Sequence, residues 1–363
     1  MANVLDLRRR IRSVKNTRQI TRAMKMVSAA KLRRAQERAL HARPYAQMLT
    51  NVLESLVRRS DLLDEGTGDV LHPLLVEREE KNVLVVVIAG DKGFAGGFNS
   101  NIGKAAQRFI DERRGQGQNI DVEPIGKKAI GLYKKRYPAA VYEHVERHYD
   151  NDLAKHVEDI RHRAAPIEIA AEHPDLIAKA DITPVSAAAH SIIARYEGAE
   201  IDAVYLVYNE FKSVISQRVV VEKLLPIRKL GTHEITAAEE MTEEQKEAAA
   251  RAAETSGVSI NEPEETQIDR EAKRFGTADV DYIFDQDPGR LFRHLMPRYV
   301  TTQIFHALLE SIAAEHAARM TATDAATKNA GELIDKLSLT MNRVRQAAIT
   351  KEIIEIVSGA AAL

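Results

Sequence analysis

The first 60 residues contain a helix-forming stretch that is too long to lie inside a compact domain. Between Asn3 and Arg59 the chain has no glycine and one proline, Pro44. One continuous helix over this stretch would be roughly 85 Å long. Something must therefore pack along it. Its apolar residues recur at steps of three and four and predict one continuous stripe, formed by Leu7, Ile11, Val14, Ile20, Met24, Val27, Leu49, Leu53 and Leu56.

A second stretch of this kind lies at the other end of the chain. Asp287 and Pro288 read as the start of a helix, and from there to about Val357 the only further breakers are two glycines and Pro297. Two such helices predict an antiparallel coiled coil with the rest of the chain inserted between them, and we expect Pro297 to bend the second helix near its start. The apolar positions of this second helix are Ile304, Leu308, Ile312, Leu333, Leu337, Met341, Val344 and Ala348.

The middle of the chain has an α/β pattern. The β-branched run Val83 to Ile88 predicts a strand, followed by a glycine-rich loop at 89–99 and a helix to about Arg114. Further strands are expected at 120–125, 140–145, 203–208 and 214–225, and helices at 127–136, 184–196 and 242–254. The prediction is a mostly parallel, Rossmann-like α/β domain. The expected organisation is an N-terminal shaft helix at 1–60, a connector at 61–80, the central α/β domain at 81–227 with an excursion at about 146–183, an acidic insertion at 228–281 and a C-terminal shaft helix at 287–363.

Charge is distributed unevenly, although 52 basic and 53 acidic residues nearly balance over the whole chain. Residues 1–60 carry 15 Lys or Arg against three acidic residues, whereas residues 227–281 carry 14 acidic and seven basic residues. The two segments are therefore expected to face different partners. The basic helix would suit nucleic acid, an acidic protein or plain solvent. Tyr45 is the only aromatic residue before Phe94, which argues against nucleic acid.

The residues do not form a recognisable catalytic or cofactor site. The glycine loop matches neither the Walker pattern nor the dinucleotide fingerprint, so we interpret it as a structural turn and not as a nucleotide site. His144 and His148 have acidic residues and His156 nearby, but on a surface excursion such groups are usually solvated and not metal ligands. No nucleophile lies in a recognisable catalytic turn, and no pair of acidic residues has a sequence context that would adjust its pKa values for proton transfer. We therefore expect no catalytic residue, no bound cofactor, no metal and no independent activity.

Two absences narrow the class further. The chain has no cysteine, which excludes disulfides, cysteine-ligated zinc and thiol chemistry. The longest apolar run, Val83 to Ala89, is far shorter than a membrane-spanning helix, and Met1 to Arg12 contain no signal-peptide core. We therefore expect a soluble protein that is not secreted.

Several segments resemble the γ subunit of F-type ATP synthases. They are the C-terminal signature Ile349 to Ala362, the opening Ile11 to Val27 followed by Arg43-Pro44-Tyr45, the central loop Asp91 to Asn99, and the segment Glu315 to Met320. These motifs occur in the order typical of that family and together span about three quarters of the chain. The departures are the segments at about 146–183 and 227–281, which make this chain longer than the plain bacterial form.

The resemblance implies a rotor. In that family the paired terminal helices form a shaft inside an α3β3 hexamer, and the α/β domain meets the ε subunit and the membrane c-ring. Proton or sodium flow would turn the ring and the shaft, and the shaft would change the nucleotide affinities of the β subunits. The chain would be a non-catalytic subunit without nucleic acid or small-molecule substrate, held peripherally on the cytoplasmic side of the bacterial cell membrane as part of F1. The implied contacts with α3β3 are Arg22, Met24, Lys25, Arg345, Gln346, Thr350 and Glu352, and those with the c-ring and ε are Tyr282, Phe284, Asp285 and Gln286.

Some alternatives stay open. Met24 could be an ordinary seam residue of the coiled coil. The chain as a whole could be a nucleic-acid or scaffold protein built on a basic coiled coil, or a nucleotide-binding enzyme that uses the loop at Gly90. The acidic insertion could be a solvent-exposed loop, or it could dock beside the shaft and hinder rotation in the hydrolysis direction. The absence of cysteine excludes thiol control of that segment.

Overall fold

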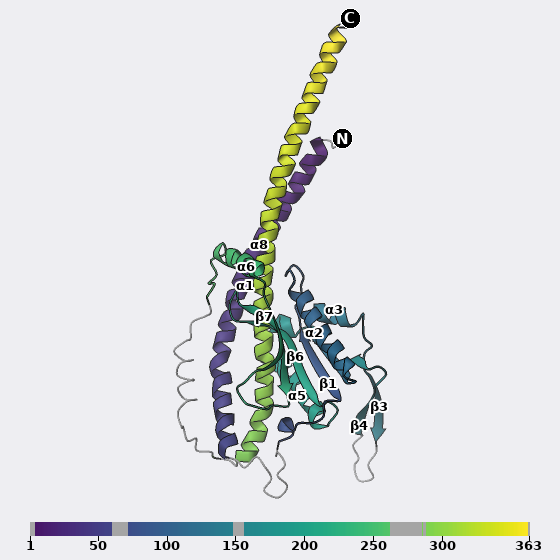
Figure 1. The fold of residues 1–363 in the computed structure, drawn as a ribbon, viewed down its shortest axis with the longest axis vertical. Coiled ribbons are helices and arrows are strands. Elements are labelled where there is room, and N and C mark those ends of the chain that lie inside the picture. The colour runs from purple at the N-terminus through teal and green to yellow at the C-terminus, as the bar shows by residue number, and fades with distance from the viewer. Residues whose placement is uncertain (1–3, 60–71, 148–155, 262–284, 286–287, 362–363) are drawn as a thin grey trace.

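Two long antiparallel helices and an α/β domain beside their lower half make up the structure, a computed structural model that describes residues 4–59, 72–147, 156–261, 285 and 288–361. Helix α1 spans Val4–Arg59 and helix α8 spans Pro288–Ala361. Figure 1 shows that α8 extends beyond the N-terminus of α1, so that the upper end of the shaft consists of α8 alone among the described residues. Pro44 and Pro297 lie within these helices. The predicted combination of a coiled coil with an α/β domain is confirmed.

The predicted apolar stripe of α1 is only partly buried. Leu7, Ile11, Leu49, Leu53 and Leu56 are buried as expected, but Ile20 and Val27 are 60% and 55% exposed. In this part of the shaft the two helices make a polar contact, in which the hydroxyl of Thr327 on α8 donates to that of Thr21 on α1 at 2.8 Å. On the facing part of α8 Ile334 is buried, whereas its neighbour Leu333, which the spacing predicted to be buried, is exposed. The expectation of a continuous stripe is therefore wrong, because the stripe is interrupted at Ile20 and Val27.

A six-stranded sheet forms the centre of the α/β domain, in the order β5-β2-β1-β6-β7-β8. Strands β1 (Asn82–Ile88), β2 (Asn119–Ile125), β5 (Ile167–Ile169) and β6 (Ala203–Phe211) are parallel. Strands β7 (Gln217–Leu225) and β8 (Glu234–Glu240) add an antiparallel edge. Strand β1 is a nearly continuous apolar run, as expected for a strand covered on both faces, whereas β2 and β5 carry the buried acidic residues Asp121, Glu123 and Glu168.

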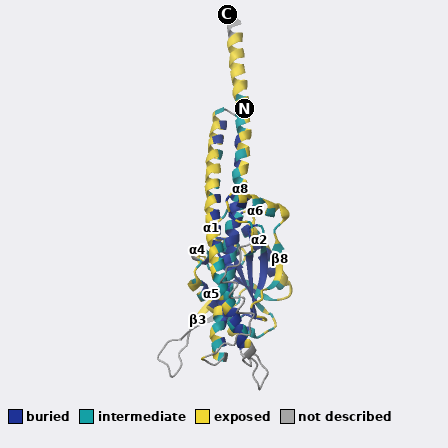
Figure 2. Ribbon diagram, turned by 90° about the vertical axis from the view of Figure 1, so that its left-hand side faces the viewer, coloured by how far each residue is buried: buried dark blue, intermediate teal, exposed yellow. Residues whose placement is uncertain are grey.

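Helices cover both faces of this sheet. On one face Val83, Val85 and Val87 pack with α2 (Phe98–Gly115), and on the other Leu84 and Val86 pack with α5 (Ile182–Glu197). Helix α8 contributes to both clusters, through residues such as Ala313 and Met320 on one side and Phe292 and Ile304 on the other. Buried residues therefore run from the sheet directly into the lower shaft, while the upper shaft is largely exposed (Figure 2).

The remaining elements are short. They are the 3-10 turn η1 (Pro73–Leu75), α3 (Lys127–Tyr133), β3 (Val141–Arg147), β4 (His156–His162), α4 (Leu176–Lys179) and α6 (Glu243–Glu254). The strand predicted at 140–145 exists as β3, but it pairs with β4 in a separate two-stranded sheet. Both segments that the sequence set apart contribute to the main sheet, β5 from the first and β8 from the second.

A buried network of ion pairs fastens the β3–β4 hairpin to the sheet edge. Asp121, Glu123 and Glu168 are all nearly fully buried. Arg161 at the end of β4 pairs with Asp121 and lies 3.0 Å from Glu168, and Arg195 of α5 lies 2.9 Å from Glu123. Burial alone would raise the pKa of Asp121, but the hydrogen bonds and positive charge from Arg161 hold it below its ordinary value. The ion pairs of Arg161 thus anchor the end of β4 to β2 and β5.

Candidate functional surfaces on the shaft

The tip of α8 is an exposed apolar rod. Ile349, Ile353, Ile354, Ile356 and Val357 are between 48% and 71% exposed. Thr327 of α8 contacts Thr21 of α1, so in an antiparallel pair Val4 lies level with about residue 344. The part of α8 beyond that level stands past the described end of α1 (Figure 1). Exposed apolar side chains gathered on one element indicate a surface that another protein covers.

The predicted contact residues of this tip lie on its surface. Arg345, Gln346, Thr350 and Glu352 are all exposed. The hydroxyl of Thr350 donates to the backbone carbonyl of Gln346 at 2.9 Å, one helical turn earlier. The structure therefore brings these four residues together on one protruding segment of α8, available to a partner.

On α1 the structure separates three neighbours that the sequence grouped together. Arg22 is exposed and Met24 is half-buried. Lys25 is buried, and its Nζ lies 2.7 Å from Oδ1 of Asp324 on α8 and 2.8 Å from Oγ1 of Thr255, the residue that follows α6. The Lys25 ammonium therefore has partners within its own chain.

A second basic residue of α1 completes this attachment of the acidic insertion. The guanidinium of Arg33 donates to the backbone carbonyls of Ser256 and Gly257. Sequence reasoning missed Arg33, Asp324 and Thr255. The available signal was Asp324, an acidic residue on an alanine-rich stretch of α8 with a lysine on the facing helix. We call these contacts of Lys25 and Arg33 the clasp.

Helix α6 has the sequence features that let it dock. Thr242 and Gln245 form a capping box at its start, with the side chain of each bonded to the backbone of the other. Ala249, Ala252 and Ala253 are nearly fully buried, and α6 packs against α8. Because alanine side chains are small, the two helix backbones can approach closely. The first part of the insertion is thus the strand β8, which pairs with β7, followed by the helix α6, which lies beside α8 (Figure 1).

The glycine loop is held against α8 by a second set of polar contacts. Arg319 donates to the carbonyls of Lys92 and Gly93 at 3.3 and 3.2 Å, and it pairs with Glu315 at 2.5 Å. A Cβ atom on Gly90 would lie 2.5 Å from Oε1 of Glu315, so a larger residue here would displace the Glu315 carboxylate that pairs with Arg319. The loop therefore joins the sheet to the shaft, which supports its interpretation as a structural turn.

A titratable cluster lies where the insertion begins. Nδ1 of His233 lies 2.6 Å from Glu222, whose other oxygen accepts a hydrogen bond of 2.7 Å from Tyr208. His306 of α8 stacks on His233 with ring centroids 6.1 Å apart, and its Nε2 lies 3.5 Å from Glu310. Burial raises the pKa of Glu310 to about 8 and lowers that of His306 to about 4. Across the described residues no three His, Asp or Glu side chains are arranged to hold a metal ion.

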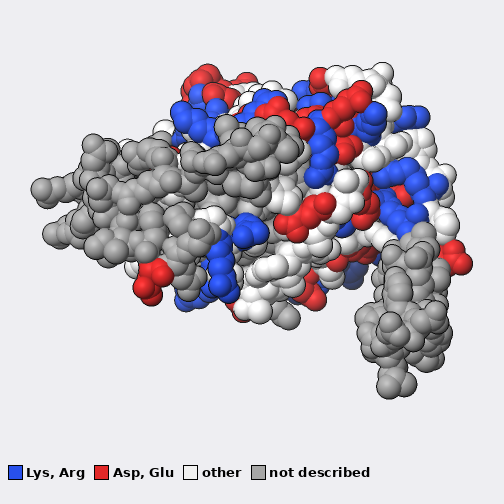
Figure 3. Space-filling model, turned by 90° about the horizontal axis from the view of Figure 1, so that it is seen from below, with Lys and Arg blue, Asp and Glu red and all other residues white. Residues whose placement is uncertain are grey.

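The predicted contacts with the c-ring and ε are mostly outside the described residues. Tyr282, Phe284 and Gln286 lie there, while Asp285 is described and exposed. His148, Asp150 and Asp152 of the histidine-rich excursion also lie outside them. Viewed from below, the described part of this end shows acidic and basic side chains intermingled (Figure 3). None of the described helices is both long and apolar enough to cross a membrane.

The fold and these surfaces define an elongated, shaft-forming subunit: two helices fixed to an α/β domain at one end, with a bare apolar tip at the other. A family model described as ATP synthase matches residues 3–363. The ATP synthase gamma chain of Solibacter usitatus (strain Ellin6076) is 43% identical over 362 residues, covering 100% of this chain and 99% of the relative. That of Geobacter metallireducens (strain ATCC 53774 / DSM 7210 / GS-15) is 39% identical over 360 residues, covering 99% and 98%. The chain belongs to the ATP synthase gamma chain family.

Two solved structures have a similar chain. One is from the central stalk and c-ring of the Tetrahymena thermophila mitochondrial ATP synthase, with a TM-score of 0.44, 21% identity and coverage of 85% of this chain and 99% of that one. The other is from the Euglena gracilis mitochondrial ATP synthase, with a TM-score of 0.49, 16% identity and coverage of 99% and 94%. The resemblance stated from the sequence is confirmed by the family match, and the shaft is consistent with the expected rotor role.

Proposed function

We propose that this chain transmits torque between a membrane c-ring, driven by protons or sodium ions, and the catalytic β subunits of an α3β3 hexamer. The observation that carries the proposal is the asymmetry of the shaft: its lower half is packed into the α/β domain, whereas its tip exposes a row of isoleucines. A shaft can bias distant sites only through contacts that differ between their states. The bare tip supplies the surface for such contacts.

The proposed contacts with α3β3 follow from exposure. Arg345, Gln346, Thr350 and Glu352 project from the tip, and Arg22 projects from the basic face of α1. Met24 is half-buried and can contribute its exposed part. Lys25 is proposed here to act indirectly, by holding α6 in place, because its ammonium is engaged with Asp324 and Thr255.

The foot of the molecule is proposed to meet ε and the c-ring. Asp285 is exposed near the start of α8, next to the predicted contacts Tyr282, Phe284 and Gln286 in the sequence. This arrangement would hold the chain peripherally on the cytoplasmic side of the bacterial membrane, as part of F1. The proposed role is that of a subunit without an active site of its own; ATP chemistry would occur on β.

The test is an Arg345→Ala variant in the assembled enzyme, purified through a tag on this chain. Contacts to charged groups contribute about 1.5–3 kcal/mol. We therefore expect ATP-driven turnover or ATP synthesis to fall by about tenfold or more without loss of assembly. Arg343→Ala is the matched control, because Arg343 is also exposed on the same helix but outside the proposed contact set. Unchanged rates in assembled Arg345→Ala enzyme, or recovery of nucleic acid in place of α and β, would contradict the proposal.

A further inference from the structure

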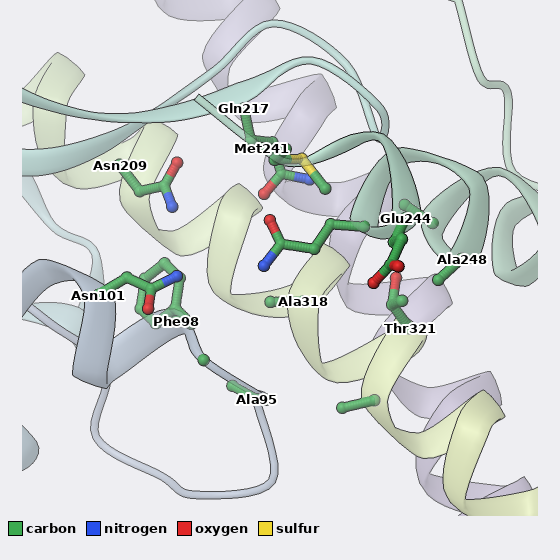
Figure 4. A pocket seen from close by; sticks show the side chains of 15 residues that line it. Ala95, Phe98, Asn101, Asn209, Gln217, Met241, Glu244, Ala248, Ala318 and Thr321 are labelled. Atoms are coloured by element: carbon green, nitrogen blue, oxygen red, sulfur yellow. The ribbon is translucent and has the colours of Figure 1, made fainter. Parts of the chain in front are cut away.

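A cavity of about 360 Å³ lies between the docked insertion, the glycine loop and α8. Figure 4 shows Asn101 of α2, Asn209 of β6 and Gln217 of β7 projecting toward it from the α/β domain, with Glu244 of α6 on the other side. A volume of roughly 300–1,000 Å³, with mainly apolar walls and a few convergent polar groups, is typical of small-molecule sites. The cavity exists only where the insertion is docked, because α6 forms one of its walls.

The polar groups around this cavity offer mainly hydrogen-bond acceptors. The hydroxyl of Thr321 donates to the carbonyl of Ala317 at 3.1 Å, which leaves its oxygen as an acceptor. Gln217 is buried, and its amide nitrogen donates to the carbonyl of Val214 at 2.8 Å. Asn209 is also buried. With its amide oriented to donate to the carbonyls of Glu210 and Arg218, its oxygen is left on the cavity side.

The charge of the cavity has one sign. Among the described residues that line it, Glu244 is the only ionisable one, and none is Lys, Arg or His. The remaining donors are amide groups such as those of Asn101 and Gln245. An anion would meet a carboxylate and no cation here, whereas a ligand rich in N–H donors and positive charge would be complemented.

We propose that this cavity binds a small organic cation of the amine or guanidine class. Its N–H groups would donate to the oxygens of Asn209, Gln217 and Thr321, and its positive charge would lie near Glu244. Its carbon chain would lie along the apolar walls formed by Phe98, Met241 and the alanines of α6 and α8. The guanidinium group suits this site because its planar set of donors can reach several acceptors at once.

Binding at this site would stabilise the docked insertion. A ligand that contacts both α6 and the α/β domain binds only when α6 is in place, so it shifts the equilibrium toward that state by mass action. The site is independent of the proposed rotor contacts, because its lining lies on the α/β domain, the insertion and a part of α8 far from the tip. Failure of one proposal therefore leaves the other standing.

The test uses the full-length chain and agmatine, which carries an amine and a guanidine on a short alkyl chain. Titration calorimetry at low salt is expected to show saturable one-to-one binding with a Kd below about 1 mM. Hydrogen exchange of the backbone amides in 243–254 is expected to slow as agmatine is added. Glutarate, a chain of similar length with two negative charges, should not bind.

Paired variants separate the cavity from general charge attraction. Glu244→Gln is expected to weaken agmatine binding by about tenfold, since it removes the negative charge that the described lining places beside the ligand. Glu247→Gln removes an equally exposed carboxylate of α6 that does not line the cavity, and it should leave the Kd unchanged. The absence of saturable binding, equal weakening by both variants, or equal binding of glutarate would overturn the proposal.

Discussion

Replacing Glu310 by glutamine should stabilise the folded chain, and the gain should grow with pH. The side chain of Glu310 on α8 is 14% exposed, and it faces the acidic residues Glu210 and Glu222 together with His233 and Arg43. Burial, with these acidic neighbours, raises its pKa from the ordinary 4.5 to about 8. Glutamine cannot ionise and has nearly the same shape, so it can still donate a hydrogen bond toward His306.

The sign and size of the effect follow from proton linkage. Between pH 4.5 and 8 the unfolded chain has lost the proton of Glu310 while the folded chain retains it. The free energy of unfolding of the native chain therefore falls as pH rises through this window and is level above it. One pKa unit corresponds to about 1.4 kcal/mol, which sets a ceiling of about 5 kcal/mol for this residue at pH 8. The two chains should differ little near pH 5.

Urea unfolding of the two full-length chains at pH 5, 6.5 and 8, followed by circular dichroism, measures this difference. Glu332→Gln is the matched control, because Glu332 is an exposed glutamate of the same helix and should give no pH-dependent gain. A Glu310→Gln chain that is no more stable than the native one at pH 8, or a gain that does not increase between pH 5 and 8, would refute the reasoning.

Two further predictions concern the attachments of the shaft. In Lys25→Gln the carboxylate of Asp324 loses its cation, so amides of 243–254 should exchange about tenfold faster or more, whereas Lys31→Gln, which changes an exposed lysine of α1, should have no effect. Unchanged exchange in Lys25→Gln would mean that α6 is held by its alanines alone. In Gly90→Ala the new methyl group collides with Glu315, so the chain should lose about 1–3 kcal/mol of stability, whereas Gly93→Ala meets no atom within 4 Å and should be close to neutral in a urea titration. Equal losses in the two glycine variants would contradict the close approach at Gly90.

The elements of this fold could be predicted because their signals are local. The glycine-free stretch at the N-terminus, the β-branched run at 83–88 and the capping residue Thr242 each determine a structure within a few residues. Which elements pack against one another could not be predicted from such local signals. Strand β8 is polar over most of its length, and its residues are exposed or half-buried. Because it lacks a regular alternation of apolar and polar residues, the sequence did not predict that it extends the sheet beside β7.

The site residues divide in the same way. Arg345 and Gln346 are exposed because they lie on α8 beyond the described end of α1. The spacing of apolar residues, which placed Val344 and Ala348 in the seam, did not predict this, and the two residues were named through the family resemblance. The inward position of Lys25 depends on Asp324, 299 positions away, and on Thr255, in a segment expected to be an insertion. No local pattern encodes such a pairing, because it arises only after the two long helices and α6 have packed together.

The distribution of polar contacts along the shaft bears on how it could carry torque. At the level of the α/β domain α8 is tied by Arg319 to the glycine loop and by the clasp, through Asp324 and Lys25, to α1. A hydrogen bond or ion pair fixes direction as well as distance, so these ties resist rotation of α8 against the domain more than apolar packing alone would. Beyond Ile334 the described side chains of α8 are half-buried or exposed, as Met341 and Val344 are. A shaft that is locked at its foot and bare at its tip transmits rotation of the foot to the tip, where it can change only the contacts that a partner makes.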